Sequence, residues 1–176
     1  VAAGLVARGL QPGDTVALMA SSRIEHVVAD MAAVHAGGVP MSIYATLSPD
    51  QVAFVAGHST PSVVVLEGAD QLARWARALE ECESIHTVVL LDESVLPDDS
   101  RAVSWADLLV EGAASRSTSP EALSARTAAV SPQDPVTILY TSGTTGNPKG
   151  VVLTHRNVLF EATSSLRTAG VDGELV

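Results

Sequence analysis

The sequence predicts an α/β fold in which a mixed or parallel sheet is flanked by helices on both faces. Short valine-rich runs alternate with longer amphipathic stretches along the first half of the chain. The hydrophobic content is 47% but only 3% of the residues are aromatic, so Ala, Val and Leu carry most of it. A core of aliphatic side chains suits helices that pack on a valine-rich sheet.

Strands are expected wherever a short apolar run is bounded by turn residues or by a helix signal. The turn Pro12-Gly13-Asp14 introduces the first of these runs, and a loop rich in Ser, Thr and Gly separates the last two. The expected strands are Thr15–Ala20, Val39–Tyr44, Ser62–Glu67, His86–Leu91, Val136–Thr141 and Gly150–His155.

The first two helices between these strands have clear start signals. Ser22 and Glu25 have the spacing of a capping box, and Gly37-Gly38 ends the helix that follows. Ser48 and Gln51 form a second box, with Pro49 at the first helical position and an end near His58. The residues expected to form the buried apolar face of the first helix are Ile24, Val27, Val28, Met31 and His35.

Later helices have weaker signals. Asp70–Cys82 and Trp105–Gly112 are expected to be helical, and Glu121–Ala128 is a weak candidate. Thr154 is placed to cap a last helix that runs to about Thr168.

The chain is expected to divide into three parts. Residues 1–112 form an N-terminal α/β subdomain that is truncated at its start. Residues 113–135, rich in Ala, Ser, Thr and Pro, form a connector. Residues 136–176 hold two strands and a helix, and begin a subdomain that continues beyond the chain.

The formal net charge of −10 argues against nucleic-acid binding, which needs clustered Lys and Arg. The lone Cys82 cannot form an internal disulfide, and no metal-ligand spacing surrounds it. No run approaches the roughly 18 apolar residues that span a bilayer, and the N-terminus lacks a signal-peptide pattern. A soluble, cytoplasmic protein is therefore expected.

The segment Thr141–Gly150 combines four hydroxyls, three glycines and Lys149, the only lysine of the chain. No acid occurs between Asp134 and Glu161, so this loop is a positive island in an acidic chain. Glycines let backbone amides approach a ligand, and hydroxyls and an ammonium group bind anionic oxygens. The alternative is a hairpin loop that happens to be rich in turn residues. Neither a Walker A loop nor a dinucleotide fingerprint is present.

The run ILYTSGTTGNPKGVVLTHRNV (residues 138–158) resembles the signature of the AMP-binding, or adenylate-forming, superfamily. The earlier segments are similar to the opening helix–strand units of that family, which would make the chain the N-terminal part of the large domain. The run SIYATLSPDQVAFVAGHS (residues 42–59) is most similar to bacterial long-chain fatty acyl-CoA synthetases.

The resemblance implies a ligase that activates a carboxylic acid as acyl-adenylate with ATP and Mg²⁺ and then transfers the acyl group to CoA. Lys149 and Thr144 are expected to act in catalysis. The residues that the resemblance assigns to the β- and γ-phosphates of ATP are Thr141, Ser142, Gly143, Thr144, Thr145, Gly146 and Lys149. It assigns no metal ligand, and it leaves peripheral membrane contact open for the complete enzyme.

Two other interpretations remain open: an adenylation domain that loads a carrier protein, and a non-catalytic nucleotide-binding fragment. The later motifs of the family, among them the C-terminal domain with its catalytic lysine, are missing, so the fragment alone is expected to be inactive.

Residues outside the loop are expected to be structural. His35 is interpreted as a core histidine and His58 as a helix-end residue that interacts with the dipole. His155 and Tyr140 are expected to serve the structure beside and beneath the loop, and Trp75 and Trp105 to be satellite packing residues.

Overall fold

A five-stranded parallel sheet forms the centre of the structure, a computed structural model that describes residues 1–141 and 148–170. Its strand order is β2-β1-β3-β4-β5, an order found in doubly wound α/β folds. The strands are β1 (Thr15–Met19), β2 (Val39–Ser42), β3 (Val63–Leu66), β4 (Thr87–Leu90) and β5 (Ala102–Ser104). This confirms the predicted α/β class and the sheet flanked by helices, while β5 is a strand that the sequence pattern did not reveal.

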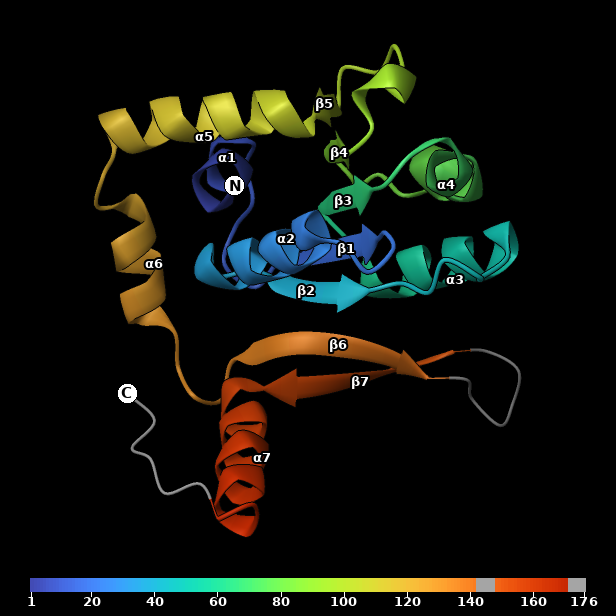
Figure 1. The fold of residues 1–176 in the computed structure, drawn as a ribbon. Coiled ribbons are helices and arrows are strands. Elements are labelled where there is room, and N and C mark those ends of the chain that lie inside the picture. Colours follow the sequence, from blue (N-terminus) through green and yellow to red (C-terminus); the bar gives the residue numbers. More distant parts are fainter. Residues whose placement is uncertain (142–147, 171–176) are drawn as a thin grey trace.

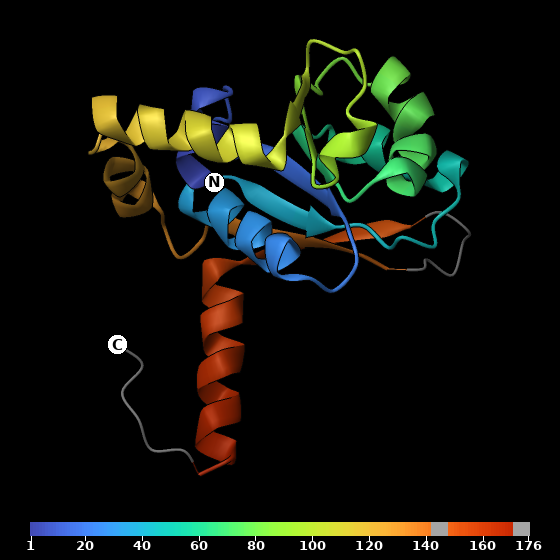
Figure 2. The ribbon, with the colours of Figure 1, turned by 45° about the horizontal axis from the view of Figure 1, so that its top comes forward.

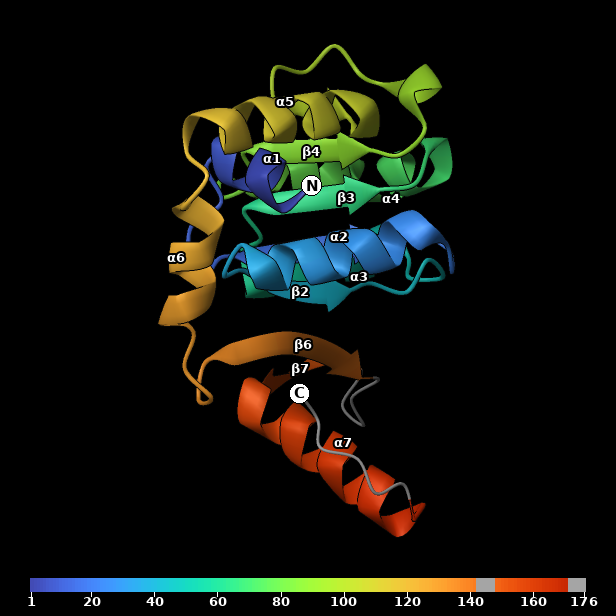
Figure 3. The same cartoon turned by 60° about the vertical axis from the view of Figure 1, so that its left-hand side comes forward.

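Helices cover both faces of this sheet (Figure 1). On one face lie α1 (Ala2–Ala7), α2 (Ile24–His35) and α5 (Trp105–Thr118), which come forward in Figure 3. On the other lie α3 (Pro49–Ser59) and α4 (Ala69–Glu81). Each face has its own hydrophobic cluster, because alternate residues of every strand point to opposite faces of the sheet: Val16 and Leu18 join one cluster, and Ala17 and Met19 the other.

The remaining described elements follow the sheet in the chain. A short 3₁₀ helix (Glu93–Val95) precedes β5, and α6 (Ala122–Ala129) follows α5. Strands β6 (Pro135–Thr141) and β7 (Lys149–Thr154) form a separate antiparallel hairpin that lies beside the edge strand β2 (Figure 1). Helix α7 (His155–Thr168) then runs away from both sheets (Figure 2).

Local capping signals were right for two helices and wrong for one. Ser48 caps α3 in the predicted box with Gln51, and Thr154 caps α7. The predicted box at Ser22 and Glu25 is wrong, because the N-cap of α2 is Arg23 and no side chain caps that end. The carboxylate of Glu25 instead accepts a 2.7 Å hydrogen bond from Nε of Arg23.

The apolar face predicted for α2 is also wrong, because it is turned outward. Ile24 is 80% exposed and Val27 63%, and His35 is exposed rather than buried in the core. The face that packs on the sheet consists of the alanines of the helix, Ala29, Ala32 and Ala33, continued by Ala36. Small side chains let the helix axis approach the sheet closely, so the larger apolar residues are left on the opposite face.

Two further expectations need correction. Trp75 is fully buried in the cluster beneath α3 and α4, so it belongs to the main core rather than to a satellite.

Helix α5 continues to Thr118 instead of ending at Gly112. Gly112 lies in the middle of this helix because α1 crosses it there, and a Cβ on Gly112 would come within 2.8 Å of the backbone nitrogen of Gly4. The glycine therefore marks a close helix contact and not a helix end.

No helix in the described ranges is long and apolar enough to cross a bilayer. The three subdomain boundaries expected from the sequence stay a prediction.

Candidate phosphate-binding site

The β6–β7 hairpin brings the two ends of the predicted phosphate loop together. Tyr140 is paired with Gly150, and Thr141 is paired with Lys149 in the last cross-strand pair before the loop. Both Thr141 and Lys149 are exposed. The hydroxyl of one and the ammonium group of the other therefore start from adjacent positions at the same end of the hairpin, as a phosphate-binding role requires.

The other residues assigned to this site lie outside the described part of the chain. They are Ser142, Gly143, Thr144, Thr145 and Gly146. Their roles stay predictions from the sequence.

Strand β6 is attached to the five-stranded sheet at several points along its length. The Thr137 hydroxyl donates a 3.0 Å hydrogen bond to the carbonyl oxygen of Pro40 in β2. Ile138 packs against the core cluster that includes residues of α3 and α4, and Tyr140, which is 8% exposed, belongs to that cluster. The end of β6 that carries Thr141 therefore rests on a packed core.

The Tyr140 side chain contacts both α3 and the opposite strand. Its hydroxyl lies 2.7 Å from Nδ1 of His58 in a hydrogen bond, and burial raises the pKa of its phenol. A Cβ on Gly150 would lie 3.2 Å from the ring carbon that bears the hydroxyl, tighter than most real contacts. Gly150 thus leaves the space in which the tyrosine ring lies, and the burial of Tyr140 in the core agrees with the packing role predicted for it.

The charge around the hairpin is favourable to an anion. Lys149 takes part in none of the ion pairs between described side chains. The nearest acids in sequence, Asp134 and Glu161, lie beyond the far end of the hairpin and in α7. A polyphosphate at the loop would therefore meet a lysine without a neighbouring carboxylate from its own strands.

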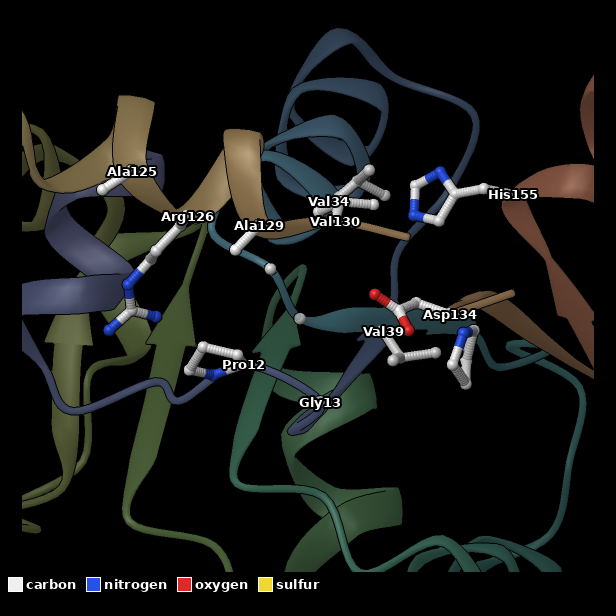
Figure 4. Close-up of a pocket in the computed structure, with 13 residues that line it drawn as sticks. Pro12, Gly13, Val34, Val39, Ala125, Arg126, Ala129, Val130, Asp134 and His155 are labelled. Atoms are coloured by element: carbon white, nitrogen blue, oxygen red, sulfur yellow. The ribbon is translucent and has the colours of Figure 1, made fainter. Parts of the chain in front are cut away.

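A pocket of about 490 Å³ lies at the opposite end of the hairpin (Figure 4). Asp134 and Pro135 from the start of β6 and His155 from the start of α7 line it, together with residues of α2 and α6. Arg126 of α6 also lines it, and its guanidinium donates to the carbonyl oxygens of Leu10 and Ala36. Because β6 has seven residues, this pocket is on the order of 20 Å from the loop and is not part of the phosphate site.

His155 lies at that pocket and not at the loop. Its backbone nitrogen donates to the carbonyl oxygen of Asp134, which closes the turn between β7 and α7 against the start of β6. This contact is in keeping with the structural role that the sequence favoured for the residue.

In the part of the chain that the structure describes, no three His, Cys, Asp or Glu side chains lie close enough together to bind a metal ion. The acids among residues 1–141 and 148–170 therefore form no cluster that would hold Mg²⁺ without the polyphosphate.

The His58–Tyr140 contact is the feature of the site that sequence reasoning missed. The two residues are 82 positions apart, and His58 was interpreted only through its place near a helix end. No local pattern pairs them, because the contact exists only once the hairpin has packed beside α3.

The comparisons with known proteins agree with this fold and this loop. A model of the AMP-binding enzyme family matches residues 1–174. Fatty acyl-CoA synthetase A of Dictyostelium discoideum is 34% identical over 97% of this chain, and a long-chain-fatty-acid–CoA ligase of Mycobacterium tuberculosis is 34% identical over 91%. The chain spans 25% of the length of each.

Solved structures of ligases share the fold at lower identity. A long-chain-fatty-acid CoA ligase from Rhodopseudomonas palustris matches 95% of this chain, with a TM-score of 0.73 and 21% identity. An anthranilate CoA ligase matches 92%, with a TM-score of 0.76 and 20% identity. This chain covers 38% and 29% of those two chains. The match to the family model extends over nearly every residue, and the chain belongs to the family of AMP-binding enzymes.

Proposed function

We propose that this chain supplies the phosphate-binding part of an ATP-dependent acid–thiol ligase that activates a fatty acid and transfers it to CoA. The observation that carries the proposal is the pairing of Thr141 with Lys149 at the end of a hairpin anchored on a parallel sheet. The names of the relatives, which are fatty acyl-CoA synthetases and ligases, supply the substrate class.

The proposed reaction has two halves. In the first, a carboxylate oxygen attacks the α-phosphorus of ATP, the bond from that phosphorus to the bridging oxygen breaks, and pyrophosphate leaves. In the second, the CoA thiol releases its proton to water, its sulfur attacks the acyl carbon, and AMP leaves with the electron pair of the acyl–oxygen bond. The loop would act in the first half, because negative charge grows on the leaving pyrophosphate as its bond breaks.

Lys149 would contribute by holding a positive charge beside that leaving group. Donors placed in advance around a developing charge stabilise the transition state more than the ground state. The loop hydroxyls and amides would add hydrogen bonds of the same kind. Mg²⁺ enters the proposal only as a companion of the polyphosphate, whose oxygens are ligands that it prefers, since the described acids offer it no site.

The test compares the rates of the two half-reactions in the full-length protein. Lys149→Ala is expected to lower fatty-acid-dependent exchange between ATP and pyrophosphate by about 10²–10³, the usual cost of one lost donor in such a site. Transfer from preformed acyl-adenylate to CoA is expected to stay close to the wild-type rate, because pyrophosphate has already left.

Arg167→Ala is the matched control for this experiment. It removes one positive charge from the exposed last turn of α7, away from the hairpin end. Unchanged pyrophosphate exchange in Lys149→Ala, or an equal loss in Arg167→Ala, would count against the assignment.

A further inference from the structure

The contact between His58 and Tyr140 joins two parts of the molecule that have no backbone pairing with each other. His58 lies in the last turn of α3, which covers one face of the five-stranded sheet, and Tyr140 lies in β6 of the separate hairpin. Their hydrogen bond is 2.7 Å long, and either atom can donate, depending on the histidine tautomer. The rings also meet edge to face, with centroids 5.9 Å apart and an interplanar angle of 84°.

The histidine side of this contact is held firmly. Val52, Val55 and Ala56 of α3 are fully buried in the core. The helix end is tied to β1 by a 2.9 Å hydrogen bond from the Thr15 hydroxyl to the carbonyl oxygen of Ser59. Because the helix is fixed at its inner face and at its end, the backbone of His58 has little freedom.

The imidazole ring itself is also oriented. Phe54, one helical turn earlier, stacks on it with ring centroids 6.1 Å apart and an interplanar angle of 12°. Residues four apart on a helix lie on the same face, so this stacking is built into α3. His58 is exposed to solvent, yet its ring is held between a neighbour on its own helix and Tyr140.

Tyr140 is adjacent in sequence to the first residue assigned to the phosphate loop. Tyr140 is the residue before Thr141, and its strand partner Gly150 is the residue after Lys149. Contact with the Tyr140 ring therefore fixes the cross-strand pair that comes just before the Thr141–Lys149 pair. A shift of this ring would displace both residues from which the loop starts.

We infer that His58 is a positioning residue for the phosphate loop, acting through Tyr140. This inference rests on the proposed function, because it specifies what holds the ends of that loop. His58 touches no substrate in this assignment; it keeps Thr141 and Lys149 at a set place relative to the five-stranded sheet.

The experiment removes the hydrogen bond from each side, and Tyr140→Phe does so while keeping the ring contacts. Tyr140→Phe keeps the ring and loses the hydroxyl, and His58→Leu loses the partner nitrogen. His58→Asn is the rescue variant, because its amide has a polar atom at the same number of bonds from Cα as Nδ1. His86→Leu is the control, since the hydrogen bond of its Nδ1 joins it to its neighbour Thr87, 3.2 Å away, at the start of β4 in the five-stranded sheet.

The first measurement is backbone amide hydrogen exchange at Thr141, Lys149 and Gly150 in the full-length protein. Tyr140→Phe and His58→Leu are expected to speed exchange at these amides by about fivefold. This is the change in the opening equilibrium constant that corresponds to the loss of one net hydrogen bond. His58→Asn and His86→Leu are expected to match the wild type. Unchanged exchange in both of the first two variants overturns the inference.

The second measurement separates positioning from general stability. In Tyr140→Phe and His58→Leu, kcat/KM for exchange between ATP and pyrophosphate is expected to fall at least about fivefold, while acyl transfer from preformed adenylate to CoA keeps its rate. An equal loss in both half-reactions would show a structural role only and would overturn the inference.

The two proposals fail in different ways. If the wild-type protein shows no pyrophosphate exchange with any carboxylic acid, the proposed function is wrong, and hydrogen exchange at the strand ends still decides whether His58 holds them. If the wild type is active and neither variant changes its activity or its hydrogen exchange, the function stands and the positioning role is wrong.

Discussion

Asp30 in α2 carries a carboxylate that folding places in an unfavourable position. Burial raises its pKa above the ordinary value, and the nearby charge of His26 offsets this only in part. A carboxyl group whose pKa is higher in the folded state favours folding at acid pH, and this contribution is lost as the pH rises through the folded-state pKa. At neutral pH the ionised Asp30 therefore costs stability.

We predict that Asp30→Asn raises the melting temperature at neutral pH. The gain should shrink as the pH is lowered through the raised pKa of Asp30, because the wild-type side chain is then also uncharged. Thermal unfolding of both proteins across this pH range measures the difference. Asp98→Asn, at an exposed aspartate, is the control. A gain that persists at acid pH would show that charge is not its cause.

The histidines show how far single residues can be interpreted from sequence. His35 was expected in the core because it continues an apolar face, and it is exposed because that face is turned outward. His58 was expected to interact only with its helix end, and it bonds to Tyr140. Both errors have one cause: the role of a histidine depends on what packs against its helix, and a periodic pattern does not contain that information.

At the scale of elements, the crossing of α1 and α5 depends on two glycines. A Cβ on Gly112 would come within 2.8 Å of the Gly4 nitrogen, and a Cβ on Gly4 would come within 2.4 Å of the Leu108 carbonyl oxygen. Both near neighbours are backbone atoms, so the helices would have to move apart to accept a methyl group. The close approach is therefore a property of both glycines.

We predict that Gly112→Ala lowers the free energy of unfolding by about 1–3 kcal/mol through overpacking, although alanine favours a helix. Gly57→Ala is the matched control, since Gly57 is also helical and has no atom within 4 Å of the added Cβ. It should stabilise the protein by about 0.5–1 kcal/mol. Urea unfolding of both variants measures the contrast, and the same sign at both positions would contradict it.

Capping chemistry could be predicted where the signal is local and complete. Ser48, Pro49 and Gln51 supply a cap, a favourable first residue and the reciprocal bond, and α3 begins there. At the start of α2 the hydrogen-bond partner is distant in sequence. Glu67, just after β3, accepts hydrogen bonds from the backbone nitrogen and hydroxyl of Ser21 and from the guanidinium of Arg23. These contacts decide how the chain enters α2, and they come from a residue more than 40 positions away.

At the scale of the whole molecule, large apolar residues remain uncovered on α2 and α7. Val27 of α2 is 63% exposed and Phe160 of α7 is 70% exposed. Exposed apolar side chains in contiguous groups favour association in water. The chain spans 25% of the length of two fatty acyl-CoA synthetases or ligases that it matches.

We predict that the 176-residue chain associates with itself as its concentration rises, and that Val27→Glu combined with Phe160→Glu shifts it toward the monomer. Sedimentation at several concentrations measures this shift. Val110→Glu combined with Leu109→Glu is the control, because Val110 and Leu109 on α5 are 69% and 44% exposed and the same two charges are added outside α2 and α7. An equal shift in the control would mean that net charge, not the apolar surface, sets the association.

The α/β class, most strands, the caps of α3 and α7 and the family of the loop were determined by the sequence alone, because each rests on residues close together in the chain. Tertiary structure decided which face of α2 is buried, why Gly112 lies within a helix, and which residue supports Tyr140. These depend on contacts between segments distant in the chain, where packing against a sheet or a second helix outweighs local preference. For that reason the sequence could identify the loop, and only the fold could show that His58 bonds to Tyr140, the residue before Thr141.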